Sequence, residues 1–169
     1  MSPLVDTEER TTENASFSEV VEIEAGHERD VFPEVVHSNA YEVKYTCLLI
    51  PRFPAHQLVG DIADYLPQWL QQICISHSWR LEYAEVSPTH FEWIISVLVS
   101  VPPARFMGAI TRQTSQMIFS EFGRLRREVL SDEFWAKGYL VVMGDEPFPD
   151  EMTRKFIRMV RHQQGLDTF

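Results

Sequence analysis

Residues 80–101, RLEYAEVSPTHFEWIISVLVSV, decide the fold of this chain. They contain two runs that are predicted to be strands, 80–86 and 90–101, joined by Ser87-Pro88-Thr89. A short, turn-prone link between two such runs is typical of a β-hairpin. Because side chains alternate between the two faces of a strand, Phe91 and Trp93 share one face of the second run, and His90 and Glu92 share the other. The apolar face is predicted to pack against helices.

The segments on either side of this hairpin alternate between strand-like and helical periodicity. Proline residues mark several of the boundaries, because proline ends a strand and is well placed in the first turn of a helix. The predicted elements are, in order, strand 42–50, helix 58–76, strands 80–86 and 90–101, a helix from Pro102-Pro103 to about Gly123, strand 138–143 and helix 149–164.

The order β-α-β-β-α-β-α predicts an α+β fold of the ferredoxin-like, split β-α-β type with an additional C-terminal helix. We expect a single antiparallel sheet with helices on one face and the other face free. This architecture hosts many unrelated activities, so it predicts no function by itself.

The charge of the chain is unevenly distributed. The 169 residues carry a net charge of −10, which at first argues against a nucleic-acid binder. Residues 1–40, however, contain ten acidic and two basic residues, and the other 129 contain 15 acidic and 13 basic residues. The sequence therefore predicts two parts: a flexible, acidic extension over residues 1–40, and a nearly neutral domain over residues 41–169.

The N-terminal segment has no basic start followed by an apolar run, so it does not resemble a signal peptide. No uninterrupted apolar stretch reaches the roughly 18 residues of a membrane span. The two cysteines, Cys47 and Cys74, lack the spacing of a metal-binding pair. These features predict a cytoplasmic protein with reduced thiols, which is nucleoid-associated if it binds DNA.

His90 and Glu92 are the first candidate site residues. They lie on the same face of the predicted strand, separated by one residue, or about 7 Å along the strand. An imidazole and a carboxylate in this arrangement can hold a divalent cation. On spacing alone, a solvated polar pair at the start of a strand is the favoured interpretation.

Basic residues form a second set of candidates. Arg154, Arg158 and Arg161 recur at helical spacing on the last predicted helix. Arg124, Arg126 and Arg127 cluster in the predicted loop before the fourth strand. They are either ordinary surface charge or a surface that contacts phosphates.

Five segments, in order, carry a resemblance to a known family. They are residues 80–90, Val101-Pro102-Pro103, Thr114-Ser115, residues 134–144 (FWAKGYLVVMG) and Phe156-Ile157. From residue 41 to about residue 164 the chain thus resembles the small single-tyrosine HUH transposases of the insertion-sequence-200 type, including the REP-associated tyrosine transposases.

The resemblance implies cleavage of single-stranded DNA by a helix tyrosine, with a divalent metal held by two histidines, in dimers that recognise hairpins. His90 matches the first histidine, whereas Glu92 replaces the second and leaves at most a weak Mg²⁺ or Mn²⁺ site. Phe156 stands at the nucleophile position without a hydroxyl group. Val160 replaces the polar residue one turn later, and Arg112 follows Thr111 where the family tends to have lysine.

Three hypotheses follow. The first is a transposase-like protein that has lost phosphotyrosine chemistry. It binds single-stranded or hairpin DNA, as a homodimer, through Arg112 and the two arginine clusters, and Trp135 or Tyr139 stacks on bases. The second is a metal-dependent nuclease with a rearranged site made of His90, Glu92 and His162. The third is a dimeric ferredoxin-like interaction module that binds no DNA.

Overall fold

The computed structural model describes residues 41–166. The predictions for the acidic segment, residues 1–40, lie outside these residues. No helix within residues 41–166 is long and apolar enough to cross a membrane.

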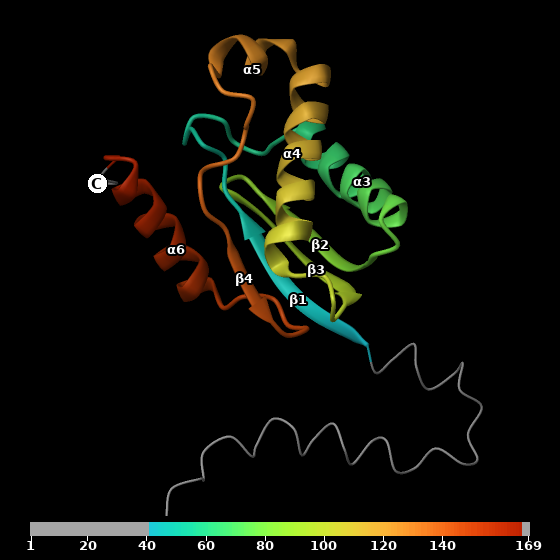
Figure 1. Ribbon diagram of the computed structural model, residues 1–169. Coiled ribbons are helices and arrows are strands. Elements are labelled where there is room, and N and C mark those ends of the chain that lie inside the picture. The colour runs from blue at the N-terminus through green and yellow to red at the C-terminus, as the bar shows by residue number, and fades with distance from the viewer. Residues whose placement is uncertain (1–40, 167–169) are drawn as a thin grey trace, which may run out of the picture. The chain divides into compact units, whose positions relative to one another are not determined.

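Four antiparallel strands form one sheet in the order β2-β3-β1-β4. The strands are β1 (Glu42–Leu49), β2 (Arg80–Ser87), β3 (His90–Leu98) and β4 (Leu140–Met143). The long central pair β1 and β3 is flanked by the hairpin partner β2 and by the short edge strand β4 (Figure 1). The predicted α+β, ferredoxin-like class and the order of its elements are confirmed.

Four helices complete the described chain: α3 (Asp61–Ser76), α4 (Pro103–Glu121), α5 (Gly123–Glu128) and α6 (Asp150–Gln163). Pro67 lies inside α3 without ending it, and Pro103 occupies the first turn of α4, where its missing N–H needs no partner. The backbone leaves helical geometry at Phe122, with φ −112° and ψ 77°, and then resumes as α5. The arginine cluster that was predicted to lie in a loop is therefore helical.

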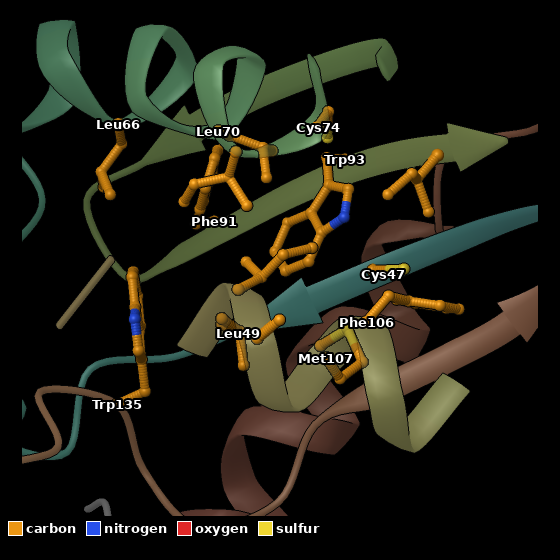
Figure 2. Packing of buried hydrophobic residues seen from close by; sticks show 14 of the residues in the cluster. Cys47, Leu49, Leu66, Leu70, Cys74, Phe91, Trp93, Phe106, Met107 and Trp135 are labelled. Atoms are coloured by element: carbon orange, nitrogen blue, oxygen red, sulfur yellow. The ribbon is translucent and has the colours of Figure 1, made fainter. Parts of the chain in front are cut away.

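The main core lies between α3, α4 and one face of the sheet. Phe91, Trp93 and Ile95 of β3 are fully buried in it, as their alternation predicts. Figure 2 shows Leu66 and Leu70 of α3 above the side chains of this strand. Burial of such large side chains contributes about 1.5–3 kcal/mol each, so this face supplies most of the hydrophobic stabilisation.

The opposite face of the sheet is partly covered, so the prediction that this face is free is wrong. Leu48 and Ile50, at the end of β1, pack in a second cluster with Phe156 and Val160 of α6. Figure 1 places α6 on the other side of the sheet from α3 and α4. The apolar residues of α6 are therefore buried against this face.

The segment before β4 is anchored to α4 by two hydrogen bonds. The Phe134 N–H donates to Ser115 Oγ at 3.0 Å, and Trp135 Nε1 donates to Thr114 Oγ1 at 2.8 Å. Trp135 is only 2% exposed, so the prediction that it stacks on bases is wrong. The Thr114-Ser115 pair, part of the family resemblance, has a structural role here.

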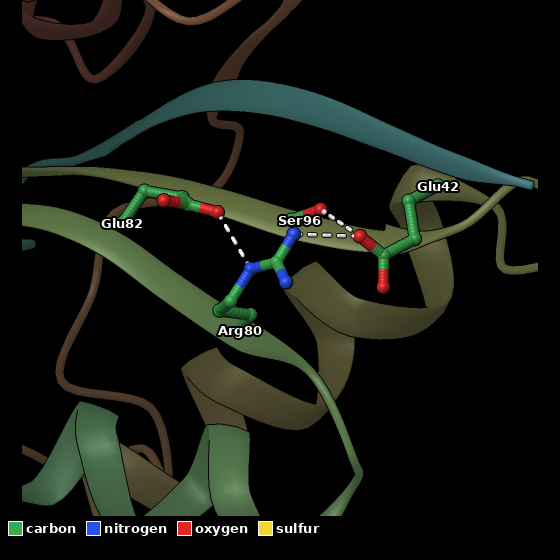
Figure 3. A network of polar contacts seen from close by, with 4 residues as sticks. All are labelled: Glu42, Arg80, Glu82 and Ser96. Atoms are coloured by element: carbon green, nitrogen blue, oxygen red, sulfur yellow. Dashed lines mark hydrogen bonds and ion pairs between the residues drawn. The ribbon is translucent and has the colours of Figure 1, made fainter. Parts of the chain in front are cut away.

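A polar network joins β1, β2 and β3 at the far end of the sheet from the hairpin turn (Figure 3). Arg80 pairs with Glu42 at 2.6 Å and with Glu82 at 2.7 Å, and Ser96 donates to Glu42 at 3.3 Å. The register of β2 on β3 shifts close by, between Leu81 and Tyr83. This end of the sheet is therefore held by charge pairs.

Candidate functional site

His90 and Glu92 lie on the same face of β3, the face that α6 partly covers. Glu92 is opposite Leu48 of β1 and Glu85 of β2 in the strand register, and His90 is opposite Ser87. Glu92 is 5% exposed, whereas His90 is half-buried. The structure thus brings the two predicted site residues together at the hairpin end of the sheet.

Glu92 makes a structural hydrogen bond. Its Oε1 accepts from the backbone N–H of Phe148, at 2.7 Å, in the segment that leads into α6. Burial raises the pKa of Glu92 above its usual value, and the Phe148 N–H opposes that shift in part. One carboxylate oxygen is therefore already engaged by the protein.

His90 is held by its neighbour in the turn, because Nδ1 lies 3.0 Å from Thr89 Oγ1. Burial lowers the pKa of His90, and the carboxylates of Glu85 and Asp150 oppose that shift. A lowered pKa favours the neutral imidazole, which is the form that binds a metal ion.

Two predicted donors for a metal ion lie together in the structure. His90 and one free oxygen of Glu92 are available, but no group of three histidine, cysteine, aspartate or glutamate residues suited to a metal ion occurs within residues 41–166. His162, the third ligand of the nuclease hypothesis, is exposed on α6 and does not join the pair in such a group. A pair of this kind leaves most of the coordination of Mg²⁺ to water.

Phe156 lies on the buried face of α6 and is 7% exposed. It shares its cluster with Leu48, the strand partner of Glu92, and with Phe148, whose N–H binds Glu92. The nucleophile position of the resemblance is thus linked to Glu92 through Phe148, and it offers an aromatic ring in an apolar setting. Val160, one turn later, is 2% exposed in the same cluster.

The arginines of α6 differ in their surroundings. Arg154 and Arg158 are exposed, with Lys155 between them. Arg161 is 4% exposed, and its Nη1 donates to the Arg52 carbonyl at 3.0 Å and to Gln164 Oε1 at 2.8 Å. Burial lowers the pKa of Arg161. Arg161 therefore anchors α6 to the segment after β1, and its predicted contact with DNA stays a prediction that its burial does not favour.

The other predicted arginines lie on α4 and α5. Arg112 and Arg126 line one open groove of about 890 Å³ with Phe119 and Asp132. The Arg126 guanidinium lies 5.2 Å from the centre of the Phe119 ring and pairs with Asp132 at 2.9 Å.

Arg124 faces a different cavity and pairs with Glu128 at 3.1 Å. Arg127 is exposed on α5. Because α4 and α6 lie on opposite faces of the sheet, these residues and the exposed bases of α6 form separate surfaces (Figure 1).

Sequence reasoning missed two groups near these sites. Tyr83 donates a short hydrogen bond to Glu85, which, with burial, raises the pKa of Tyr83 to about 12. His56 is 9% exposed and binds Glu128 through Nε2 at 2.8 Å. No local pattern marks His56, because its partner is 72 positions away in the chain.

Comparison with known proteins gives a consistent result. The family model described as "Transposase IS200 like" matches residues 39–159. The transposase for insertion sequence element IS200 of Salmonella typhimurium is 24% identical over 101 residues, or 60% of this chain and 66% of the relative. The ISDra2 transposase TnpA of Deinococcus radiodurans is 21% identical over 106 residues, 63% of this chain and 76% of the relative.

The chain thus spans just under two thirds of the length of the IS200 transposase it matches. Among solved structures, a candidate transposase from Deinococcus radiodurans superposes with a TM-score of 0.59 at 20% identity, over 76% of this chain and 94% of the other. This superposition shows that the two proteins share a fold. The REP-associated tyrosine transposase, solved with a REP hairpin, gives a TM-score of 0.44 at 10% identity, over 73% of this chain and 69% of the other.

Proposed function

Because the chain belongs to the family of IS200-like transposases, we propose that it binds single-stranded or hairpin DNA without forming a phosphotyrosine link. The observation that carries the proposal is the burial of Phe156 in the cluster that contains Phe148, whose N–H binds Glu92. Attack on a phosphodiester needs a hydroxyl oxygen that can lose its proton, and a phenylalanine ring has none.

The tyrosines of the chain do not supply a replacement nucleophile. The five are Tyr41, Tyr45, Tyr65, Tyr83 and Tyr139, and none lies on α6. Tyr83 is close enough to Glu92 for the two groups to interact electrostatically. Its phenol donates to Glu85, and a pKa of about 12 keeps it protonated at neutral pH. These contacts support loss of the covalent step.

The metal chemistry of the family is also weakened on this chain. The bond from Phe148 engages one oxygen of Glu92, and the buried Val160 adds no ligand from α6. These contacts support a role in which the site positions α6, and no step of a reaction is assigned to a metal ion here.

The exposed bases of α6 are the proposed contact with DNA phosphates. Arg154, Lys155 and Arg158 are exposed on one helix whose opposite side is tied to the sheet. Tyr139, 40% exposed just before β4, can stack on an unpaired base. Phosphate contacts of this kind give salt-dependent binding with little preference for sequence.

A fluorescence anisotropy titration of the full chain with labelled hairpin and unstructured oligonucleotides tests this proposal. We expect a variant that combines Arg154→Gln and Arg158→Gln to bind DNA at least tenfold more weakly. The slope of the logarithm of affinity against the logarithm of salt concentration should fall by about two, because about two phosphate contacts are lost. Arg105→Gln, which removes an exposed arginine at the start of α4, is the matched control. Equal affinities in all three proteins, or no binding at 50 mM salt, would contradict the proposal.

The separation of the basic residues between two faces of the sheet also favours a second candidate, an interaction module that binds no DNA. Light scattering combined with the same titration separates the two. A stable dimer without DNA binding supports the module, and DNA binding supports the transposase-like role, with the homodimer as its expected state.

A further inference from the structure

A pocket of about 320 Å³ lies where the C-terminal end of α6 meets the segments that follow β1 and precede β4. Its wall is formed by Arg52, Lys137, Val160, Gln163 and Gln164. Two of these residues are cationic and two carry amide groups, and no carboxylate within residues 41–166 belongs to the wall. The described wall therefore offers N–H donors and positive charge with no opposing charge.

The backbone fixes the positions of the two cationic residues relative to each other. The Arg52 N–H donates to the Phe134 carbonyl at 2.9 Å, and the Ala136 N–H donates to the Ile50 carbonyl at 2.8 Å. Lys137 follows directly after this paired segment. Neither Arg52 nor Lys137 forms a side-chain ion pair with another residue of the described range 41–166. Both charges are therefore available to a ligand.

Arg161 contacts two residues of the wall and is a buried charge without a counter-charge in the part of the chain that the structure describes. It is 4% exposed, and its Nη1 donates to the Arg52 carbonyl and to Gln164 Oε1, which both belong to neutral groups. No carboxylate of residues 41–166 forms an ion pair with it. Charged side chains are seldom so buried unless they are paired. An anion in the adjacent pocket would supply the missing negative charge.

The side-chain amide of Gln164 is fixed at both ends. Its Oε1 accepts the bond from Arg161, and its Nε2 donates to the Arg52 carbonyl at 3.0 Å. An amide nitrogen carries two hydrogens, so Nε2 retains one N–H for a ligand. The carbonyls at the end of a helix oppose an anion, but those of Val160, Arg161 and His162 already accept bonds from the N–H groups of the three residues that follow α6. The helix end therefore weakens the site less than free carbonyls would.

We propose that this pocket binds a phosphate group, held by the Arg52 guanidinium, the Lys137 ammonium group and the remaining amide N–H of Gln164. Phosphate oxygens accept charge-assisted hydrogen bonds from such donors, and a guanidinium can present two of them to one phosphate. The bound anion also offsets the charge of Arg161, which lies outside the wall. The site goes beyond the proposed function, because its wall includes neither the exposed bases of α6 nor the His90/Glu92 pair. The phosphate belongs either to the backbone of a DNA strand or to a small phosphate ligand.

Titration of the full chain with inorganic phosphate at constant ionic strength, followed in ¹H–¹⁵N spectra, tests the site. We expect saturable shifts of the backbone amide of Lys137 and of the side-chain amide of Gln164. Arg52→Gln and Lys137→Gln should each raise the dissociation constant at least fivefold, because each removes a charge-assisted donor. Arg105→Gln and Lys44→Gln, which remove exposed bases outside the pocket, are the matched controls and should leave the constant unchanged.

Shifts that do not saturate, or the same dissociation constant in the pocket variants and the two controls, would overturn the proposal. Lys137 is exposed, so Lys137→Gln keeps the test valid if Arg52→Gln fails to fold. A single-stranded oligonucleotide that shifts the same amides, with an affinity that Lys137→Gln weakens, identifies the phosphate as that of DNA. A response to inorganic phosphate alone identifies a small ligand. The phosphate titration does not require DNA binding through α6, so this proposal and the proposed function fail separately.

Discussion

The buried carboxylate of Glu92 accepts a hydrogen bond from the backbone N–H of Phe148 at 2.7 Å, and Phe148 packs in the same cluster as Phe156. A position that the family resemblance assigns to a metal ligand therefore ties the sheet to the segment that leads into the last helix. The contact gives this position a structural role.

Glu92→Ala should lower the free energy of unfolding by about 1–3 kcal/mol, because it leaves the Phe148 N–H without its acceptor. Glu92→Gln keeps a carbonyl oxygen at the same place and should cost less. Chemical denaturation of the full chain measures both. Equal losses in the two variants would show that the hydrogen bond contributes nothing.

The same carboxyl group should make stability depend on pH. Burial raises the pKa of Glu92 above its usual value of 4.5, so over an interval above pH 4.5 the folded state holds a proton that the unfolded state has released. The contribution of Glu92 is therefore fully present below pH 4.5 and is lost as pH rises through its folded-state pKa. The stability of the wild type relative to Glu92→Gln should fall from pH 4 to pH 7, and a rise would contradict the assignment.

Phe156→Ala should destabilise the protein by about 3–5 kcal/mol, because it empties a buried site against the sheet. Met159→Ala, at a half-exposed position of the same helix, should change stability by less than about 0.5 kcal/mol. Thermal unfolding followed by circular dichroism compares the two variants. A small effect at Phe156 would mean that α6 does not depend on the cluster.

Phe156→Tyr restores a hydroxyl group at the nucleophile position but should not restore DNA cleavage, because Glu92 already binds the Phe148 N–H and the apolar Val160 adds no ligand. The readout is a protein-linked oligonucleotide on a denaturing gel in the presence of Mn²⁺. Cleavage by this variant would show that the remaining donors are sufficient.

Arg161→Gln should destabilise the fold by about 1–3 kcal/mol without weakening DNA binding, because its guanidinium is buried against the Arg52 carbonyl. Arg158→Gln should show the reverse, weaker binding with little change in stability. Denaturation and anisotropy measured on both variants make the comparison. Parallel effects would place the two arginines on one surface.

Local periodicity in the sequence was sufficient to predict the strands, the main helices and the apolar face of β3. Phe91 and Trp93 alternate with His90 and Glu92 along the sequence, and the structure places the two pairs on opposite faces. The break at Phe122 was not predicted, because residues 123–128 have no apolar periodicity and α5 buries no side chain.

The environments of the candidate residues could not be predicted from the sequence and are known only from the three-dimensional structure. Arg161 and Arg158 are both arginines at helical spacing, and only the contact with Arg52, 109 positions away, distinguishes the buried one. The partners of Trp135 and His56 also lie far away in the sequence. The resemblance identified the position of Phe156, whereas its apolar surroundings depend on the end of β1 and on the Phe148 segment.

The most direct test of the central claim runs one reaction on two gels. Full-length protein is incubated with a labelled hairpin oligonucleotide and Mn²⁺, and the sample is divided between a native gel and a denaturing gel. We expect a retarded complex on the native gel and an intact, protein-free oligonucleotide on the denaturing gel. A protein-linked oligonucleotide, or no retarded complex at 50 mM salt, would contradict it.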